Sequence, residues 1–135
     1  MPARSSFDYA LIRVVPRVER EEFINVGAIL YCRTRAVLAA RIALDRARLA
    51  ALAPDLDIDE IQAHLDLIPL ICAGADAAGA VGRFSQSERF HWLVAPRSTM
   101  IQTSPVHSGT GTNPGAALDH IMATLVLPLD ASAAR

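Results

Sequence analysis

The chain has 135 residues, of which 52% are hydrophobic and 20% charged, and its formal net charge is −1. This length and apolar content predict a single globular domain with a buried core, and they exclude an intrinsically disordered chain. Charges of both signs are spread along the sequence, which argues against a nucleic acid or a membrane surface as partner. All 13 basic residues are arginine, which excludes lysine chemistry.

Two cysteines and the N-terminal segment indicate the cellular setting. Cys32 and Cys72 have no spacing that predicts a disulfide, so we expect two buried free thiols. The apolar run near the N-terminus is interrupted by Arg13 and Pro16 and is too short for a signal peptide or a membrane span. These features predict a cytoplasmic protein.

The first half of the chain predicts three strands. Residues 7–15 carry apolar side chains on both faces, which is typical of a central strand. Arg13 interrupts this pattern and needs a carboxylate, a route to solvent or a bound anion. After a helical turn at 18–23, residues 26–33 and 37–44 form a predicted hairpin.

Capping residues mark three helices. Asp45 precedes a helix over 46–52, and Asp57 precedes one that begins at residue 58, with Glu60 in a capping-box position. Pro69 is expected to kink or shorten the second helix before Gly74. Asn113 and Pro114 begin a third helix, which Pro128 ends.

Residues 87–109 concentrate polar and aromatic side chains. Alternation over 88–95 predicts a strand, residues 96–99 a turn and residues 100–106 a returning strand. Residues 73–82 and 108–112 are small and flexible and are predicted as loops, while 1–6 and 130–135 are expected to be loose tails. The prediction is one α+β domain over 1–135, an antiparallel sheet of about five strands with helices packed mainly on one face.

Two stretches, YALIRVVPRVEREEFINVGAILYCR and SERFHWLVAPRSTMIQTSPVHSG, resemble the bacterial family called domain of unknown function 3037. The helical segment between them, LDRARLAALAPDLDIDEIQAHL, has the character of the same family. Members resemble small accessory proteins encoded beside HipA-like kinases, so the resemblance implies a partner or regulator of such a kinase. It implies no catalytic residues.

The sequence offers little support for a metal site or for a catalytic nucleophile. The conceivable metal ligands are His91, His107 and either Cys72 or His64, but no CxxC, HxxxH or HExxH spacing joins them. A hydrolase would need Ser104 or Ser108 with His107 and Glu88, and neither serine lies in a GxSxG motif. We therefore predict no metal, no cofactor and no catalytic set.

An anion site is a stronger hypothesis. Arg89 and Arg97 flank the predicted strand, and the SGTGT run leads into the last helix and offers hydroxyl and backbone donors. Asn113 can explain the start of that helix by capping alone. The candidate ligand-binding residues are Arg13, Arg89, His91, Arg97, Ser98 and His107.

A protein-interaction surface is the other hypothesis. Trp92 is the only tryptophan and lies close to Phe90 and to arginines, which are favoured interface anchors, although burial in the core is the commoner fate of such aromatics. The sequence favours a non-enzymatic accessory or regulatory protein; the alternative binds a small ligand or phosphate at Arg97 and His107. A pocket that joins Arg13, Arg97 and His107 would favour the ligand, and an exposed apolar patch around Phe90 and Trp92 would favour the partner. The sequence leaves the oligomeric state open.

Overall fold

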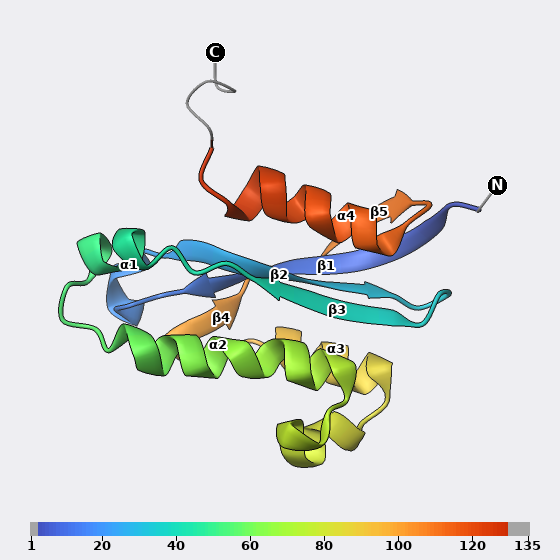
Figure 1. Ribbon diagram of the computed structural model, residues 1–135, viewed down its shortest axis with the longest axis horizontal. Helices are drawn as coiled ribbons and strands as arrows, with labels where there is room; N and C mark the ends of the chain where they lie inside the picture. The colour runs from blue at the N-terminus through green and yellow to red at the C-terminus, as the bar shows by residue number, and fades with distance from the viewer. Residues whose placement is uncertain (1–2, 130–135) are drawn as a thin grey trace.

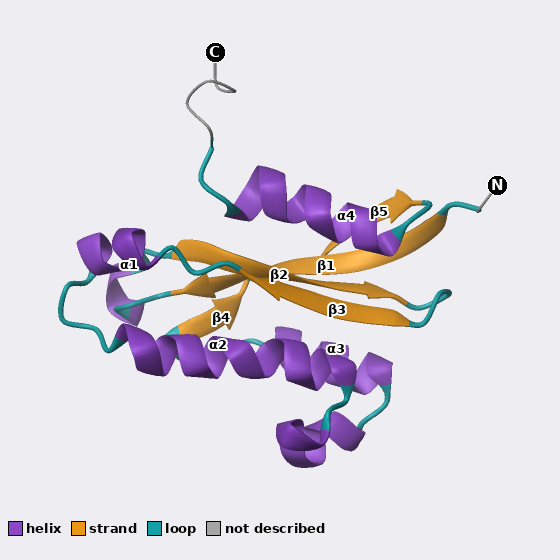
Figure 2. Ribbon diagram, in the orientation of Figure 1, coloured by secondary structure: helices purple, strands orange, loops and turns teal. Residues whose placement is uncertain are grey.

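An antiparallel sheet forms the middle layer of the protein, with helices on either side of it (Figure 1; Figure 2). The computed structural model describes residues 3–129. The strand order is β3-β2-β1-β4, and β5 also pairs with β1. The strands are β1 (Ser5–Val14), β2 (Ile24–Cys32), β3 (Val37–Ile42), β4 (Ile101–Thr103) and β5 (His107–Gly111). The predicted α+β class is confirmed.

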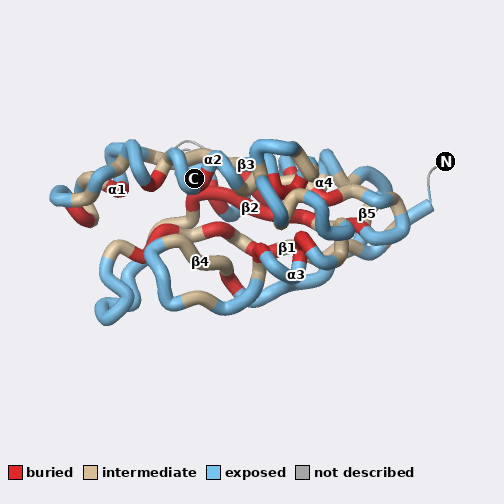
Figure 3. The backbone as a smooth tube through the Cα atoms, turned by 90° about the horizontal axis from the view of Figure 1, so that it is seen from below, coloured by how far each residue is buried: buried red, intermediate tan, exposed pale blue. Residues whose placement is uncertain are grey.

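The strand β1 lies at the centre of the sheet, as its apolar residues on both faces predict. It pairs with β2 along one edge, with a bulge between Ile12 and Arg13. Along its other edge it pairs with β5 near its start and with β4 near its end. Buried backbone follows β1 and β2 through the middle of the molecule (Figure 3). The strand begins at Ser5, two residues before its predicted start, so part of the expected loose N-terminal tail belongs to the sheet; residues 1–2 and 130–135 lie outside the described residues.

Two helices confirm the predictions from their caps. Asp45 accepts a hydrogen bond from the Arg48 amide and begins α1 (Arg46–Leu52). Asp57 accepts one from the Glu60 amide and begins α2 (Ile58–Ala73). Pro69 lies inside α2 without ending it, and Gly74 ends the helix with a positive φ of 67° that suits glycine. The short turn η1 (Val18–Arg20) lies within the segment predicted as a helical turn.

Apolar clusters join the helices to the two faces of the sheet. The face under α2 is packed with buried side chains, among them Ile12, Val14, Ile29, Leu49, Leu65 and Phe90. On the opposite face lies α4 (Pro114–Ile121), capped by Asn113 and continued by the π-helical turn η3 (Met122–Val126). Leu118, Ile121, Met122 and Val126 pack there against Ala28, Leu30 and Cys32. Each face of the sheet thus has its own core.

The predicted strand over residues 88–95 is wrong, because this segment forms the helix α3 (Gln86–Val94). Ser85 accepts a hydrogen bond from the Glu88 amide while the Glu88 side chain accepts one from the Ser85 amide. This capping box favours a helix. Phe90 and Leu93 are buried at helical spacing, whereas Trp92 is exposed. The segment before α3, predicted as a loop, contains the 3₁₀ turns η2 (Asp76–Arg83).

The predicted loop over residues 108–112 is also wrong, because it lies almost wholly within β5. Gly109 pairs with Phe7, and a Cβ atom at Gly109 would lie 2.8 Å from the Phe7 ring. The glycine therefore permits a close approach within the sheet, a role that glycine has inside strands. Of the strand predicted over residues 100–106, only the part that forms β4 is a strand in the structure.

Within residues 3–129, no single helix combines the length and apolarity needed to cross a membrane. The bent pair α2 and η2 meets these criteria only when its two parts are taken together.

Candidate functional site

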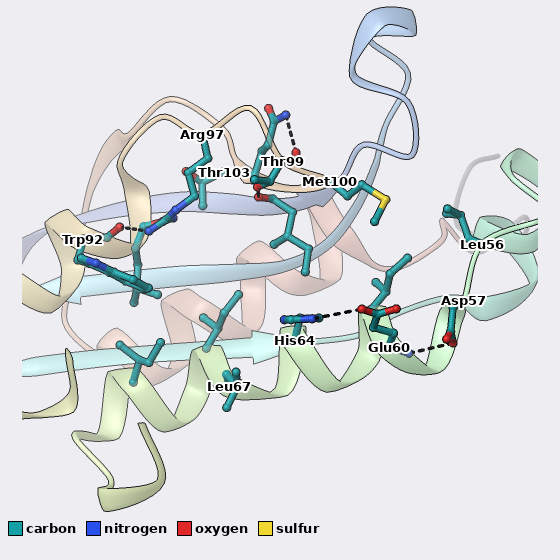
Figure 4. A pocket seen from close by; sticks show the side chains of 16 residues that line it. Leu56, Asp57, Glu60, His64, Leu67, Trp92, Arg97, Thr99, Met100 and Thr103 are labelled. Atoms are coloured by element: carbon teal, nitrogen blue, oxygen red, sulfur yellow. Dashed lines mark hydrogen bonds and ion pairs between the residues drawn. The ribbon is translucent and has the colours of Figure 1, made fainter. Parts of the chain in front are cut away.

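A groove of about 430 Å³ lies between α2, the end of α3 and the segment that leads into β4 (Figure 4). One wall is formed by α2 along most of its length. Residues 97–103 form the other, so the groove joins segments about 30 residues apart in the sequence. Its lining residues are Leu56, Asp57, Glu60, Ile61, His64, Leu67, Ile68, Ile71, Trp92, Leu93, Arg97, Thr99, Met100, Ile101, Gln102 and Thr103. We call this feature the α2–β4 groove.

Large apolar side chains dominate the α2–β4 groove. Ile61, Ile71 and Leu93 are buried and belong to the core beneath it. Leu67, Trp92 and Met100 lie along it with 43%, 42% and 41% of their surfaces exposed. Exposed apolar side chains that gather in one concave surface indicate a binding site, because water contact with them is unfavourable.

Arg97 lies at the α3 end of the α2–β4 groove. Its guanidinium carbon is 4.5 Å from the centre of the Trp92 ring, a cation–π arrangement. It donates hydrogen bonds to the Leu93 and Trp92 carbonyl oxygens at 2.9 and 2.6 Å. These carbonyls belong to the last turn of α3, where a cation is favoured. The side chain is therefore held in place while its remaining N–H donors are available for an anionic group.

The other end of the α2–β4 groove is acidic. Asp57 is engaged as the cap of α2, where its Oδ1 atom accepts from the Glu60 amide at 3.2 Å. The Glu60 Oε1 atom lies 3.9 Å from His64 Nε2, and both side chains are largely exposed. Figure 4 shows Asp57 and Glu60 at the end of the groove opposite Trp92 and Arg97. The groove thus has an apolar middle and opposite charges at its ends.

Arg89 has a structural environment. It is buried, and its guanidinium donates to the Phe84 and Ile71 carbonyls, both at 2.9 Å, and to the Cys72 carbonyl. The bonds to Ile71 and Cys72 satisfy carbonyls at the end of α2, and the bond to Phe84 joins α3 to the end of η2. Burial raises the pKa of the Cys72 thiol to about 12, although the nearby Arg89 charge acts in the opposite direction. Cys72 is therefore a neutral core thiol.

Three other predicted ligand residues lie away from the α2–β4 groove. The Nδ1 atom of His91 is 2.7 Å from the Ser87 carbonyl oxygen on the exposed side of α3. His107 lies in β5, where its ring centre is 5.4 Å from that of Tyr9. Ser98 is exposed in the connection to β4. Of the six candidates, only Arg97 lines the groove.

Arg13 lies on the α4 side of the sheet, because it alternates with Ile12 and Val14 on the α2 side. Its guanidinium lies 4.0 Å from the Phe23 ring centre. Its buried Nε atom has no hydrogen-bond partner among residues 3–129, and neither does Oδ1 of Asn25, the residue opposite it in β2. Burial lowers the Arg13 pKa. Arg13 and His107 are therefore not part of the groove that contains Arg97.

The two predicted partner anchors have different environments. Phe90 is buried, with its ring centre 5.3 Å from that of Tyr31. Trp92 is exposed in the α2–β4 groove. Sequence reasoning missed Leu67 and Met100. Leu67 carried a usable signal, since it is a large apolar residue that falls outside the helical spacing of Ile58, Ile61, Leu65, Ile68 and Cys72.

A second hollow, of about 640 Å³, lies between α4 and the strands β1 and β5. It is lined largely by small and polar residues of the SGTGT run and by Arg4, Asn113 and His120. Arg4 donates to the Thr110 hydroxyl at 2.8 Å, and Asn113 accepts from the Ala116 amide. These groups satisfy one another within the fold. Across the described residues, no cluster of three histidine, cysteine or acidic side chains could hold a metal ion.

Together these features define a small α+β protein that has helices on both sides of its sheet and an apolar groove beside α2. Residues 9–126 match the family model described as "Protein of unknown function (DUF3037)", and the chain belongs to this family. The resemblance noted in the sequence is therefore confirmed. No curated protein and no solved structure matches the chain significantly.

Proposed function

We propose that this protein is a non-enzymatic accessory or regulatory protein that binds a partner protein through the α2–β4 groove. The observation that carries the proposal is the exposure of Leu67, Trp92 and Met100 along one concave surface. Tryptophan and arginine are the residues that most often dominate interface energetics. Trp92 and Arg97 are stacked at one end of the groove, so this pair is already arranged as an anchor.

The chemistry of the lining supports binding over catalysis. The groove residues include neither serine nor cysteine, and the histidine among them pairs with Glu60. Two N–H groups of Arg97 bond carbonyls of α3, and the remaining donors suit an acidic group of a partner. The family resemblance points to a HipA-like kinase as the partner, and we propose a kinase of this kind as the occupant of the groove.

The experiment is a pull-down and a calorimetric titration with that kinase. The test variant is Leu67→Arg, which places a charge in the middle of the groove. The matched control is Leu125→Arg, because Leu125 is 44% exposed but lies in η3 on the other side of the sheet. We expect Leu67→Arg to weaken binding at least about tenfold, the effect of losing roughly 1.4 kcal/mol. Absence of binding by the wild type, or equal loss in both variants, would overturn the proposal.

A small ligand is the second candidate, and the size of the groove favours it. Its volume of about 430 Å³ is in the range of small-molecule sites. Arg97 would hold an anionic group while the apolar walls hold the remainder. A thermal-shift screen against nucleotides, phosphates and medium-chain carboxylates should then show stabilisation that Arg97→Ala removes and Arg13→Ala retains. Unchanged melting with every compound would exclude these ligands.

A further inference from the structure

We infer that the α2–β4 groove binds one amphipathic helix of the partner, with a basic residue over Glu60 and an acidic residue over Arg97. This inference rests on the proposed function and adds the kind of segment that is bound. It depends on the arrangement of charges around the groove, which is independent of the apolar exposure that supports docking itself.

Each end of the groove has one charged side chain suited to a partner. Asp57 is occupied as the cap of α2, and Asp59 pairs with Arg46 at the helix surface. Glu60 also lines the groove, and among the described residues its carboxylate forms one ion pair, with His64 at 3.9 Å. At the far end Arg97 is fixed by its two carbonyl bonds and by Trp92. A complementary segment must therefore carry opposite charges at its two ends.

The apolar middle sets the spacing of that segment. Leu67 follows Glu60 by seven residues in α2, which corresponds to about 10 Å along a helix. Trp92 and Arg97 lie at the far end of the groove (Figure 4). The lining residues of α2 continue from Glu60 to Ile71, eleven residues or about 16 Å along the helix. An amphipathic helix of about three turns has this length and presents apolar side chains at i, i+3 or i+4, and i+7.

The same charges disfavour other occupants. A small carboxylate would use Arg97 and leave the acidic end unpaired. An anionic membrane surface would be repelled by Glu60 and Asp57. A helix with a basic end and an acidic end complements both Glu60 and Arg97.

The test uses three designed helical peptides with the same leucine face. One carries lysine at one end and glutamate at the other, one carries lysine at both ends, and one carries glutamate at both ends. Fluorescence anisotropy at low salt measures their affinities for the purified protein. We expect the mixed peptide to bind the wild type about fivefold more tightly than either of the others, as exposed ion pairs allow. Glu60→Lys should shift the preference to the glutamate peptide, and Arg97→Glu to the lysine peptide.

Arg97 also caps α3, so replacing it changes both the charge of the groove and the end of the helix. A second variant separates these two effects. Arg97→Gln keeps hydrogen-bond donors, and it should reduce the advantage of the mixed peptide while the circular dichroism spectrum stays unchanged. Equal binding of all peptides, with Leu67→Arg still weakening binding to the kinase, would overturn the charge inference and leave docking intact. Absence of kinase binding would instead overturn the proposed function. Dimerisation that Leu67→Arg abolishes would identify a second copy as the occupant and also overturn the inference.

Discussion

The α2–β4 groove and the hollow beside α4 both lie between a helix and the sheet, yet they differ in chemistry. The hollow beside α4 has a volume of about 640 Å³ against about 430 Å³ for the groove, but its polar side chains Arg4, Ser108 and Thr110 form hydrogen bonds within the fold. Leu125 is the exposed large apolar side chain among the described lining residues of that hollow, whereas the α2–β4 groove presents three, Leu67, Trp92 and Met100. Unmet apolar surface, and not volume, therefore distinguishes the candidate binding site.

The largest expected effect contrasts a packing leucine with a groove leucine. Leu118 is 1% exposed in the core under α4, so Leu118→Ala should lower the free energy of unfolding by about 3 kcal/mol. Leu67 is 43% exposed, so Leu67→Ala should change it by less than about 0.5 kcal/mol. Urea denaturation measures both. Similar losses would mean that Leu67 contributes to the core and not to a binding surface.

Two arginines offer a contrast of intermediate size. Arg89 donates to the Ile71 and Cys72 carbonyls at the end of α2 and to the Phe84 carbonyl after η2, and Arg89→Met should cost about 2 kcal/mol because the buried acceptors of α2 lose their donor. Arg13 has a buried Nε atom without a partner among the described residues, so Arg13→Met should be within about 0.5 kcal/mol of the wild type. Thermal and urea unfolding provide the comparison. A larger loss of stability in Arg13→Met than in Arg89→Met would contradict these roles of the two arginines.

The smallest effect at neutral pH concerns Cys72. Its pKa rises from 9.0 to about 12 on folding, so the folded state favours the neutral thiol. The resulting stability is fully present below pH 9 and is lost as the pH rises toward 12. Cys72→Ala should therefore show a shallower fall in stability over this window, measured by urea unfolding at each pH. At pH 8 a thiol reagent should modify Cys72 only after unfolding; rapid labelling of the folded protein would contradict its burial.

The sequence predicted the local elements better than the site. Caps such as Asp57 and Asn113 are local signals, and they correctly mark the starts of α2 and α4. The apolar positions Phe90, Trp92 and Val94 fit a strand, and only the Ser85–Glu88 capping box identifies the helix α3. The groove was beyond sequence reasoning because it forms where α2 meets residues 97–103. Tertiary packing brings these distant segments together, so Leu67 and Met100 could not be paired in advance.

The most direct test of the central claim uses Trp92, the only tryptophan of the chain and a residue of the groove. Protein labelled with 5-fluorotryptophan should give one ¹⁹F resonance, which reports the environment of that ring even when the partner contains tryptophan. On titration with the HipA-like kinase, we predict that the resonance shifts and that its sensitivity to solvent decreases, because Trp92 becomes buried. Saturable binding that leaves the Trp92 resonance and its solvent sensitivity unchanged would contradict docking in the α2–β4 groove.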